Sequence, residues 1–260
     1  MPTSFRRAAR LAFGWRWFHG NYAAWSDARR ACGSYDDSAI VERVLAATQA
    51  VRRGTAAYER DGVLFHEPAP EAGLLAALGT VAQASCAGPA VLDFGGALGT
   101  TFWRHRAALP GPPLRWDVVE QPRFVTAGRT HFAGTPVQFF ASIEEAEGAA
   151  PHDVLLASTS LQYLEDPPAT AGEWQRREFP WLLFNNLPLH EDGPTRLAVQ
   201  QVPPEIYPAS YPVWFFNRAE FLGWFAGGYE VVQEFASEAV WPVGWRYYAS
   251  TGLLMRRKQS

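Results

Sequence analysis

The sequence predicts an α/β fold in which an open, mostly parallel sheet carries helices on both faces. The C-terminal two-thirds of the chain contains seven short apolar runs, and helical patterns separate most of them. The runs are continuous rather than alternating, which is typical of strands that are buried on both faces. Because a helix between two strands indicates a right-handed parallel crossover, these observations favour a parallel sheet.

The first 88 residues are expected to form an N-terminal helical cap region (1–88), and residues 89–260 the α/β domain. NYAAWSDARRAC (21–32) has apolar residues at helical spacing, and SAIVERVLAATQAVRRG (38–54) has the same pattern and ends at a glycine. A third helix is expected over 71–84, where LLAAL and VAQA supply strong helix formers.

The expected strands of the sheet are short and apolar, and they span 90–94, 114–120, 137–141, 153–159, 181–186, 229–235 and 246–255. The expected helices between them span 100–108, 123–131, 169–177 and 218–225. No helical pattern separates the last two strands, only a stretch that contains WPVGW. We therefore expect an antiparallel hairpin at the end of the sheet.

Residues 187–217 form an insertion that is too long for an ordinary connection and is rich in Pro, Tyr and Gln. An insertion after a late strand lies above the carboxyl edge of the sheet, where ligands bind. We interpret it as part of a substrate wall; a surface excursion without function is the alternative.

Composition and charge exclude several classes of protein. A formal net charge of -3 gives no broad basic surface, so nucleic acid is not an expected partner. Cys32 and Cys86 fit neither a disulfide framework nor a zinc site, which favours free thiols in a reducing cytoplasm. The apolar part of the N-terminus is too short for a signal peptide, and no run of about 18 apolar residues predicts a membrane span.

The loop VLDFGGALGT (91–100) follows the first expected strand and predicts a ligand site. Gly95, Gly96 and Gly99 do not have the spacing of the dinucleotide fingerprint. Asp93 stands two residues before the first glycine, and its carboxylate would repel a pyrophosphate. It suits a cationic ligand, such as the ammonium and sulfonium of S-adenosylmethionine (SAM). Asp93, Phe94 and the three glycines are therefore predicted to bind the cofactor.

Glu120 ends the second expected strand, where an acid can accept hydrogen bonds from both ribose hydroxyls. A surface acid at a strand end is the alternative. Gln121 is expected to border the adenosine, and Ser142 and Ile143, after the third strand, to flank the adenine. The stretch from Ser158 to Tyr163 is expected to cross the floor of the site, between cofactor and substrate, with Ser158 on the cofactor.

Asp93-x-Gly95-x-Ala97-x-Gly99 resembles the first motif of the class I SAM-dependent methyltransferases, with Ala97 in place of the middle glycine. This resemblance implies a Rossmann-like, seven-stranded class I methyltransferase sheet and SAM as the cofactor.

The resemblance extends over nearly the whole chain. Six blocks, in order, are similar to a family of bacterial methyltransferases often encoded near surface-polysaccharide genes. They are GNYAAWSDARRACGSYDDSAI, YERDGVLFHEP, VLDFGGALGTTFWRHR, VVEQPRFVTAG, STSLQYLEDP and NNLPLHEDGPTRLAVQQVPPEIYPASYPVWFFN. The resemblance implies the N-terminal helical cap and leaves the acceptor open. Some relatives have an Asp-Arg pair where this chain has Asn185-Asn186.

A hydroxyl acceptor must lose its proton during methyl transfer, and histidine is the usual base near neutral pH. His190, at the start of the insertion, is the first candidate, and His66 the second. An exposed loop histidine is the alternative for His190. The charge cluster Glu59–Asp61 suits either a solvated turn or structural ion pair, or a cap element that closes over the cofactor or binds a polar substrate.

Aromatic and amide side chains of the insertion suit a sugar-like or natural-product acceptor, because sugar and aromatic rings stack on aromatic faces. The expected substrate contacts are Tyr163, Gln201, Tyr207, Tyr211 and Trp214. The sequence thus favours a cytoplasmic SAM-dependent methyltransferase acting on oxygen of a small polar or glycosyl acceptor. A non-catalytic SAM-binding scaffold and a nicotinamide-dependent oxidoreductase are the alternatives. The aromatic N-terminus suits a homodimer contact, a lid or a partner site equally well.

Overall fold

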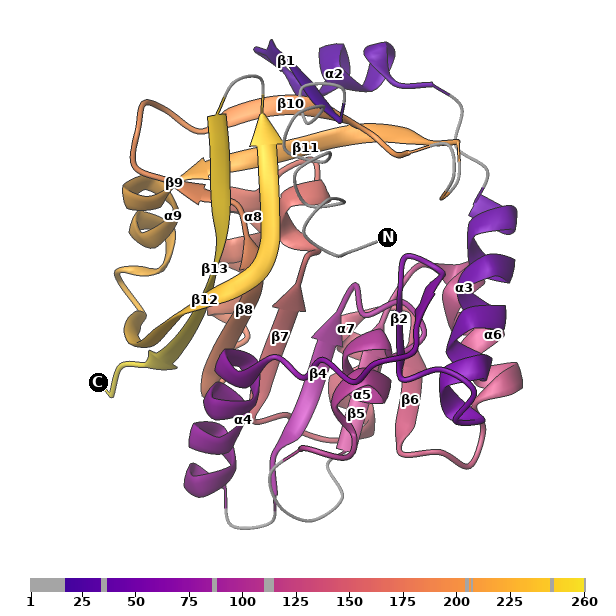
Figure 1. The fold of residues 1–260 in the computed structure, drawn as a ribbon. Coiled ribbons are helices and arrows are strands. Elements are labelled where there is room, and N and C mark those ends of the chain that lie inside the picture. Colours follow the sequence, from indigo (N-terminus) through magenta and orange to yellow (C-terminus); the bar gives the residue numbers. More distant parts are fainter. Residues whose placement is uncertain are drawn as a thin grey trace.

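A computed structural model describes residues 17–33, 37–85, 88–109, 115–203, 206, 208–243 and 246–259 of the chain. Its centre is a seven-stranded sheet in the order β12-β13-β8-β7-β4-β5-β6 (Figure 1). The strands are β4 (Ala90–Phe94), β5 (Arg115–Val119), β6 (Val137–Phe140), β7 (Val154–Ser158), β8 (Trp181–Leu187), β12 (Tyr229–Val243) and β13 (Arg246–Arg257).

The five strands from β6 to β8 are parallel to their neighbours, whereas β13 runs antiparallel to β8 and β12 antiparallel to β13. The predicted parallel α/β sheet and its terminal hairpin are therefore confirmed. The chain begins the sheet at β4, moves outward through β5 to β6, and returns to place β7 on the other side of β4. The strand order thus reverses between β4 and β7, and ligands of open α/β sheets bind at such a point.

Each strand divides its side chains between two apolar cores, because successive residues point to opposite faces. On β4, Val91 lies in one core and Leu92 in the other. The first core is covered by α3 (Asp37–Arg52), α4 (Ala72–Ala84), α5 (Thr100–His105) and α6 (Pro122–His131). The second is covered by α7 (Ile143–Ala149), α8 (Pro167–Arg176) and α9 (Arg218–Phe225). Helices on both faces are confirmed.

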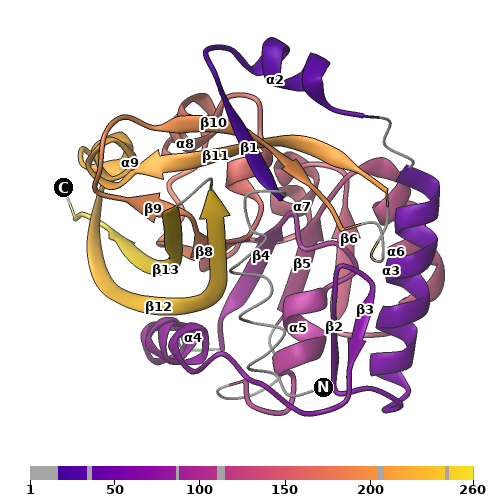
Figure 2. The same ribbon diagram turned by 45° about the horizontal axis from the view of Figure 1, so that its top comes forward.

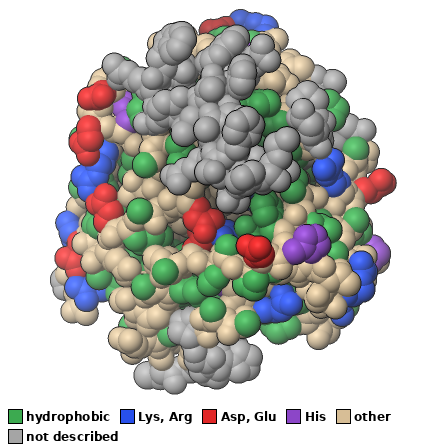
Figure 3. Space-filling model, in the orientation of Figure 1, with side chains coloured by type: hydrophobic (Ala, Val, Ile, Leu, Met, Phe, Trp, Pro, Cys, Tyr) green, Lys and Arg blue, Asp and Glu red, His purple; other side chains and the backbone are tan. Residues whose placement is uncertain are grey.

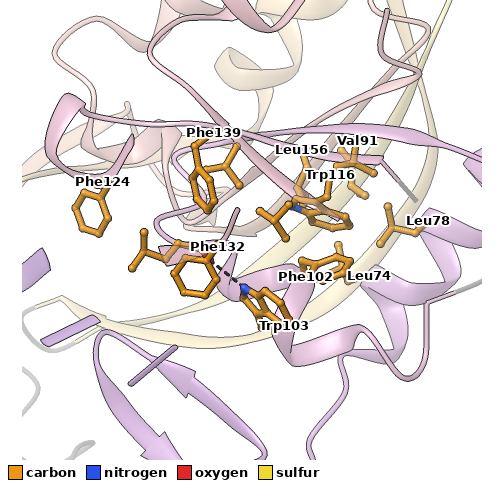
Figure 4. Close-up of a cluster of buried hydrophobic side chains, with 14 of the residues drawn as sticks. Leu74, Leu78, Val91, Phe102, Trp103, Trp116, Phe124, Phe132, Phe139 and Leu156 are labelled. Carbon is orange, nitrogen blue, oxygen red and sulfur yellow. Dashed lines mark hydrogen bonds between the residues drawn. The ribbon is translucent and has the colours of Figure 1, made fainter. Parts of the chain in front are cut away.

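The first core is rich in aromatic rings and lies beneath the glycine loop. Figure 4 shows Trp116 near Val91 and Leu156, with Phe102 and Trp103 below them. The indole N–H of Trp103 donates a hydrogen bond to the carbonyl oxygen of Leu98 at 3.1 Å. The loop therefore rests on a packed aromatic base.

The N-terminal region is not wholly helical. The helices α2 (Trp25–Ala31), α3 and α4 are as predicted, but β1 (Phe18–Tyr22), β2 (Tyr58–Arg60) and β3 (Val63–Phe65) are strands. β2 and β3 form a hairpin whose turn residues, Asp61 and Gly62, have φ values of 53° and 72°. Two left-handed residues in a two-residue turn are the signature of a type I′ hairpin, for which Asp-Gly is a preferred sequence.

The insertion forms a second, four-stranded sheet together with the N-terminal strand. Its order is β1-β10-β11-β9, in which β9 spans Leu189–His190, β10 Arg196–Gln201 and β11 Ser210–Asn217. Figures 1 and 2 show this sheet above the carboxyl ends of β4 and β7. The 3-10 turn η2 (Leu161–Tyr163), which follows β7, contacts β11. The insertion therefore lies above the carboxyl edge of the main sheet, as predicted.

Residues of α3 and α4 share the first core with the main sheet, as Val44, Val51 and Leu78 do, so these helices pack directly on it. Cys32 is a free thiol, and Cys86 lies outside the described residues. On the face shown in Figure 3, Lys and Arg side chains are interspersed with acidic ones. Within the described ranges, no helix has the length and apolar character needed to cross a membrane.

Candidate functional site

The glycine loop follows β4 at the point where the strand order reverses. Three of its residues have left-handed backbone conformations: Gly95 (φ 72°), Ala97 (φ 51°) and Gly99 (φ 82°). Such a conformation costs a non-glycine residue about 1–2 kcal/mol. Ala97 thus adopts a backbone conformation that glycine takes more readily.

The glycines also allow close packing of the loop against the chain itself. A Cβ on Gly95 would lie 2.7 Å from the Cβ of Ser160, and a Cβ on Gly96 would collide with the carboxyl of Asp93. The backbone N–H of Gly95 donates a hydrogen bond to the carbonyl oxygen of Val119 at 2.9 Å. These contacts fix the loop against the ends of β5 and β7.

Asp93 is fully buried beneath the loop. Its Oδ2 accepts a hydrogen bond from the indole N–H of Trp116 at 2.9 Å, whereas its Oδ1 has no hydrogen-bond partner among the described residues. Burial raises the pKa of Asp93 to about 7; the Trp116 hydrogen bond opposes this shift, and the nearby Glu120 adds to it. The site therefore contains a buried, incompletely satisfied carboxyl. Direct contact of Asp93 with a cofactor stays a prediction.

Glu120 lies directly after β5, beside the loop, because Val119 pairs with Phe94. Its carboxylate accepts a hydrogen bond from the backbone N–H of Gln121 at 2.6 Å and lies near the backbone N–H of Ala97. Burial raises the pKa of Glu120, and both N–H groups oppose that shift. The structure thus brings Asp93, the loop and Glu120 together, as predicted from the sequence.

Three other predicted cofactor residues lie at the starts of α6 and α7. The hydroxyl of Ser142 caps α7 by accepting a hydrogen bond from the backbone N–H of Glu145 at 3.2 Å. Ile143 is buried in the second core. Gln121 is exposed and precedes the first residue of α6. Their roles beside an adenosine stay predictions.

A buried polar network at the carboxyl ends of β7 and β8 was not anticipated. The side-chain amide of Asn185 donates hydrogen bonds to Glu71 at 2.7 Å and to Ser158, a predicted cofactor residue, at 3.3 Å. Glu71 forms an ion pair with Arg104 of α5, and Arg104 also pairs with Glu238 at 2.8 Å. The predicted cofactor residue Phe94 lies apart from this network, edge-on to Trp174.

Glu59, from the charge cluster Glu59–Asp61, is a buried acid beside the glycine loop. It lies on β2, is only 2% exposed, and accepts hydrogen bonds from the hydroxyl of Thr100 and from the backbone N–H of Gly62. Burial raises its pKa to about 7, against the effect of these two hydrogen bonds. The alternative of a solvated turn is therefore wrong for Glu59.

The two candidate bases lie in different environments. His66 is exposed just after β3. His190 is not an exposed loop residue, because it lies in β9 and is 6% exposed. Its Nε2 lies 3.2 Å from the carbonyl oxygen of Phe215, its Nδ1 has no partner among the described residues, and its ring contacts that of Tyr248.

The predicted substrate residues are partly brought together. The hydroxyl of Tyr163 donates a hydrogen bond to the side chain of Gln200 at 2.7 Å, and its ring packs edge-on against Tyr211. The indole N–H of Trp214 donates to the carbonyl oxygen of Leu164 at 3.0 Å. Both contacts link the second sheet to the segment after β7; its place as the floor of the site stays a prediction.

The remaining predicted substrate residues contribute less to this arrangement. Gln201 is exposed and donates a hydrogen bond to the carbonyl oxygen of Ala209 at 3.2 Å. Tyr207 lies outside the described residues.

The raised pKa values predict that the ligand-free protein loses stability as the pH rises. Asp93 and Glu59 titrate near 3.8 and 4.5 in their ordinary state and near 7 when buried, so between these values the folded state binds more protons than the unfolded state. The free energy of unfolding should therefore fall from about pH 4 to pH 7, by at most about 1.4 kcal/mol per pH unit for each carboxyl. Denaturant titrations at several pH values measure this slope.

The variants Asp93→Asn and Glu59→Gln serve as the test of this assignment. Each removes one titrating group and should flatten the decline in stability between pH 4 and 7. An unchanged slope in both variants would show that other groups cause it.

No protein-family model matches this chain, and no curated protein matches it. Among solved structures, the N-terminal domain of EvdMO1, in the presence of S-adenosylhomocysteine (SAH) and D-fucose, has a TM-score of 0.47 and 15% identity, over 81% of this chain and 96% of that chain. The CcbJ methyltransferase from Streptomyces caelestis has a TM-score of 0.46 and 15% identity, over 74% and 91% of the two chains.

Magnesium protoporphyrin IX methyltransferase from Synechocystis PCC 6803, with bound SAM, has a TM-score of 0.45 and 14% identity, over 98% of this chain and 92% of that chain. With TM-scores below 0.5, these similarities are distant.

Proposed function

We propose that the protein is a SAM-dependent methyltransferase. The observation that carries this proposal is the loop itself: three left-handed residues follow β4 at the reversal of strand order, and the carboxylate of Glu120 lies beside them at the end of the next strand. A backbone of this shape lets a ligand approach closely. A carboxylate at the end of the adjacent strand is the group that accepts hydrogen bonds from ribose hydroxyls.

The charge of the site favours SAM over a dinucleotide. Asp93, Glu120 and Glu59 border the loop, and among the described residues none of them forms an ion pair with Lys or Arg. Hydrogen bonds alone offset the burial of these carboxyls, which still have raised pKa values, and a cationic ligand would favour their charged forms. A pyrophosphate would instead be repelled. The residues present therefore fit SAM, which supplies an activated methyl group when bound.

The acceptor is proposed to be a hydroxyl of a small polar or glycosyl molecule, with His190 as its base. If the Nε2–H of His190 donates its hydrogen bond to Phe215, the tautomer is fixed and the lone pair of Nδ1 is left available to take a proton. Tyr163 and Tyr211 supply aromatic faces for a sugar ring, and Gln200 a polar group beside them.

Release of SAH in the presence of a panel of glycosyl and other hydroxyl acceptors, followed by mass spectrometry, tests this proposal. We expect one acceptor class to give methylated product. We also expect His190→Gln to lower turnover about 10²–10⁴-fold while leaving SAM affinity unchanged, because general base catalysis contributes about that much.

His131→Gln, on the exposed surface of α6, is the matched control and should keep full turnover. Loss of turnover in His66→Gln but not in His190→Gln would assign the base to His66. Full turnover in both variants would exclude a histidine base and favour an acceptor that needs none.

A further inference from the structure

We infer that Glu59 is a positioning residue that holds the glycine loop in its ligand-binding conformation through Thr100. This inference rests on the proposed function, since it assigns the loop to SAM. The inference gives a role to the β2–β3 hairpin, which links the N-terminal region to the glycine loop.

The contacts form a short chain from the hairpin to the loop. Glu59 accepts a hydrogen bond from the hydroxyl of Thr100, the first residue of α5. The backbone N–H groups of Thr100 and Gly99 both donate to the carbonyl oxygen of Gly96, at 3.3 and 2.9 Å. Glu59 is therefore bonded to the residue that closes the loop, and any movement of Thr100 away from Glu59 disturbs these closing bonds.

The hairpin itself is held firmly on α5. Its two aromatic rings, Tyr58 and Phe65, stack face to face with centroids 4.5 Å apart. The guanidinium of Arg104 lies over the ring of Tyr58 at 4.4 Å, and Arg104 also forms the buried ion pair with Glu71. Glu59 is thus fixed between the turn at Gly62 and the first turn of α5, and it cannot follow Thr100 if the loop relaxes.

The loop needs such support because of Ala97. Glycine adopts left-handed conformations readily, whereas alanine strongly prefers other regions of backbone space. A strained residue persists only where its surroundings fix the conformation. Here the carboxylate of Glu120 lies near the N–H of Ala97 on one side, and the Glu59–Thr100 hydrogen bond fixes the following turn on the other.

Calorimetric titration with SAM tests this inference in a set of matched variants. Thr100→Val replaces the hydroxyl with a methyl group and Glu59→Ala removes the acceptor, whereas Thr100→Ser keeps the hydroxyl. If the competent loop becomes about tenfold less populated, the apparent Kd rises about tenfold. We expect this loss in Glu59→Ala and Thr100→Val, and less than about threefold in Thr100→Ser.

The decisive step is rescue by Ala97→Gly. In the Glu59→Ala and Thr100→Val backgrounds, this substitution should restore SAM affinity to near that of the wild type, because glycine needs no support in the left-handed region. Glu178→Gly is the control: Glu178 also has a left-handed φ of 59° but lies between α8 and β8, away from the loop, and it should restore nothing. Unchanged affinity in Glu59→Ala, or a loss that Ala97→Gly does not restore, would overturn the inference.

Amide hydrogen exchange of residues 95–100 in the ligand-free protein decides the inference even if SAM does not bind. Faster exchange in Glu59→Ala and Thr100→Val, by about tenfold, but not in Thr100→Ser, is the expected result. Equal exchange in all variants would overturn the inference. Failure of the wild type to bind SAM would instead contradict the proposed function.

Discussion

Glu120→Ala is expected to weaken SAM binding about a hundredfold or more. A carboxylate that accepts two hydrogen bonds from ribose hydroxyls contributes about 1.5–3 kcal/mol for each bond, and a factor of ten in Kd corresponds to about 1.4 kcal/mol. Glu120 lies at the end of β5 beside the loop, where it can reach such hydroxyls. Calorimetric titration with SAM and with SAH measures the effect, and both ligands should lose affinity alike because they share the ribose.

The control for this variant is Glu120→Gln, which keeps one oxygen acceptor near the N–H groups of Ala97 and Gln121. It should lose less affinity than Glu120→Ala, and both variants should remain folded by circular dichroism. Equal SAM affinity in the wild type and Glu120→Ala would show that Glu120 makes no ribose contact and is only a surface acid at a strand end.

Gly96→Ala is expected to lower the free energy of unfolding by about 1–3 kcal/mol, which is typical of overpacking in a well-packed interior. The added Cβ would collide with the carboxyl of Asp93. That carboxyl is fully buried and bonded to Trp116, so it cannot move aside without losing its hydrogen bond. Denaturant unfolding of the purified variant measures the loss, and SAM affinity should fall with it because the loop is displaced.

Gly79→Ala is the matched control, because Gly79 lies within α4 and a Cβ there would meet nothing within 4 Å. Alanine is the better helix former by about 1 kcal/mol, so this variant should be more stable than the wild type. If Gly96→Ala stabilised the protein as much as Gly79→Ala, this result would contradict the close contact between Gly96 and the carboxyl of Asp93.

The main sheet could be predicted because its strands are buried on both faces and therefore carry continuous apolar runs. β4 spans 90–94, the range expected from AVLDF alone. The second sheet could not be predicted in the same way, because β1 pairs with β10, which lies far along the chain. The β2–β3 hairpin has a local signal, the Asp-Gly pair in ERDGV. Its strands have only three residues each, too few to show an alternating pattern between the two helical segments.

In the site too, features that depend on neighbouring residues could be predicted, whereas those that depend on residues far along the chain could not. Asp93, the glycines and Glu120 could be singled out because each lies at or just beyond the carboxyl end of a strand: Asp93 is in β4, the glycines follow it, and Glu120 follows β5. The burial of Glu59 and the hydrogen bonds of Asn185 could not be predicted, since they depend on partners elsewhere in the chain: Thr100 for Glu59 and Glu71 for Asn185. His190 was correctly placed after β8, but its burial depends on Phe215 and Tyr248, which come from later strands.

Calorimetric titration of the wild-type protein with SAM, and separately with SAH, tests the central claim most directly. The proposed function predicts that both ligands bind at one site per chain. Absence of binding of either ligand to well-folded protein would contradict the assignment of the glycine loop to SAM.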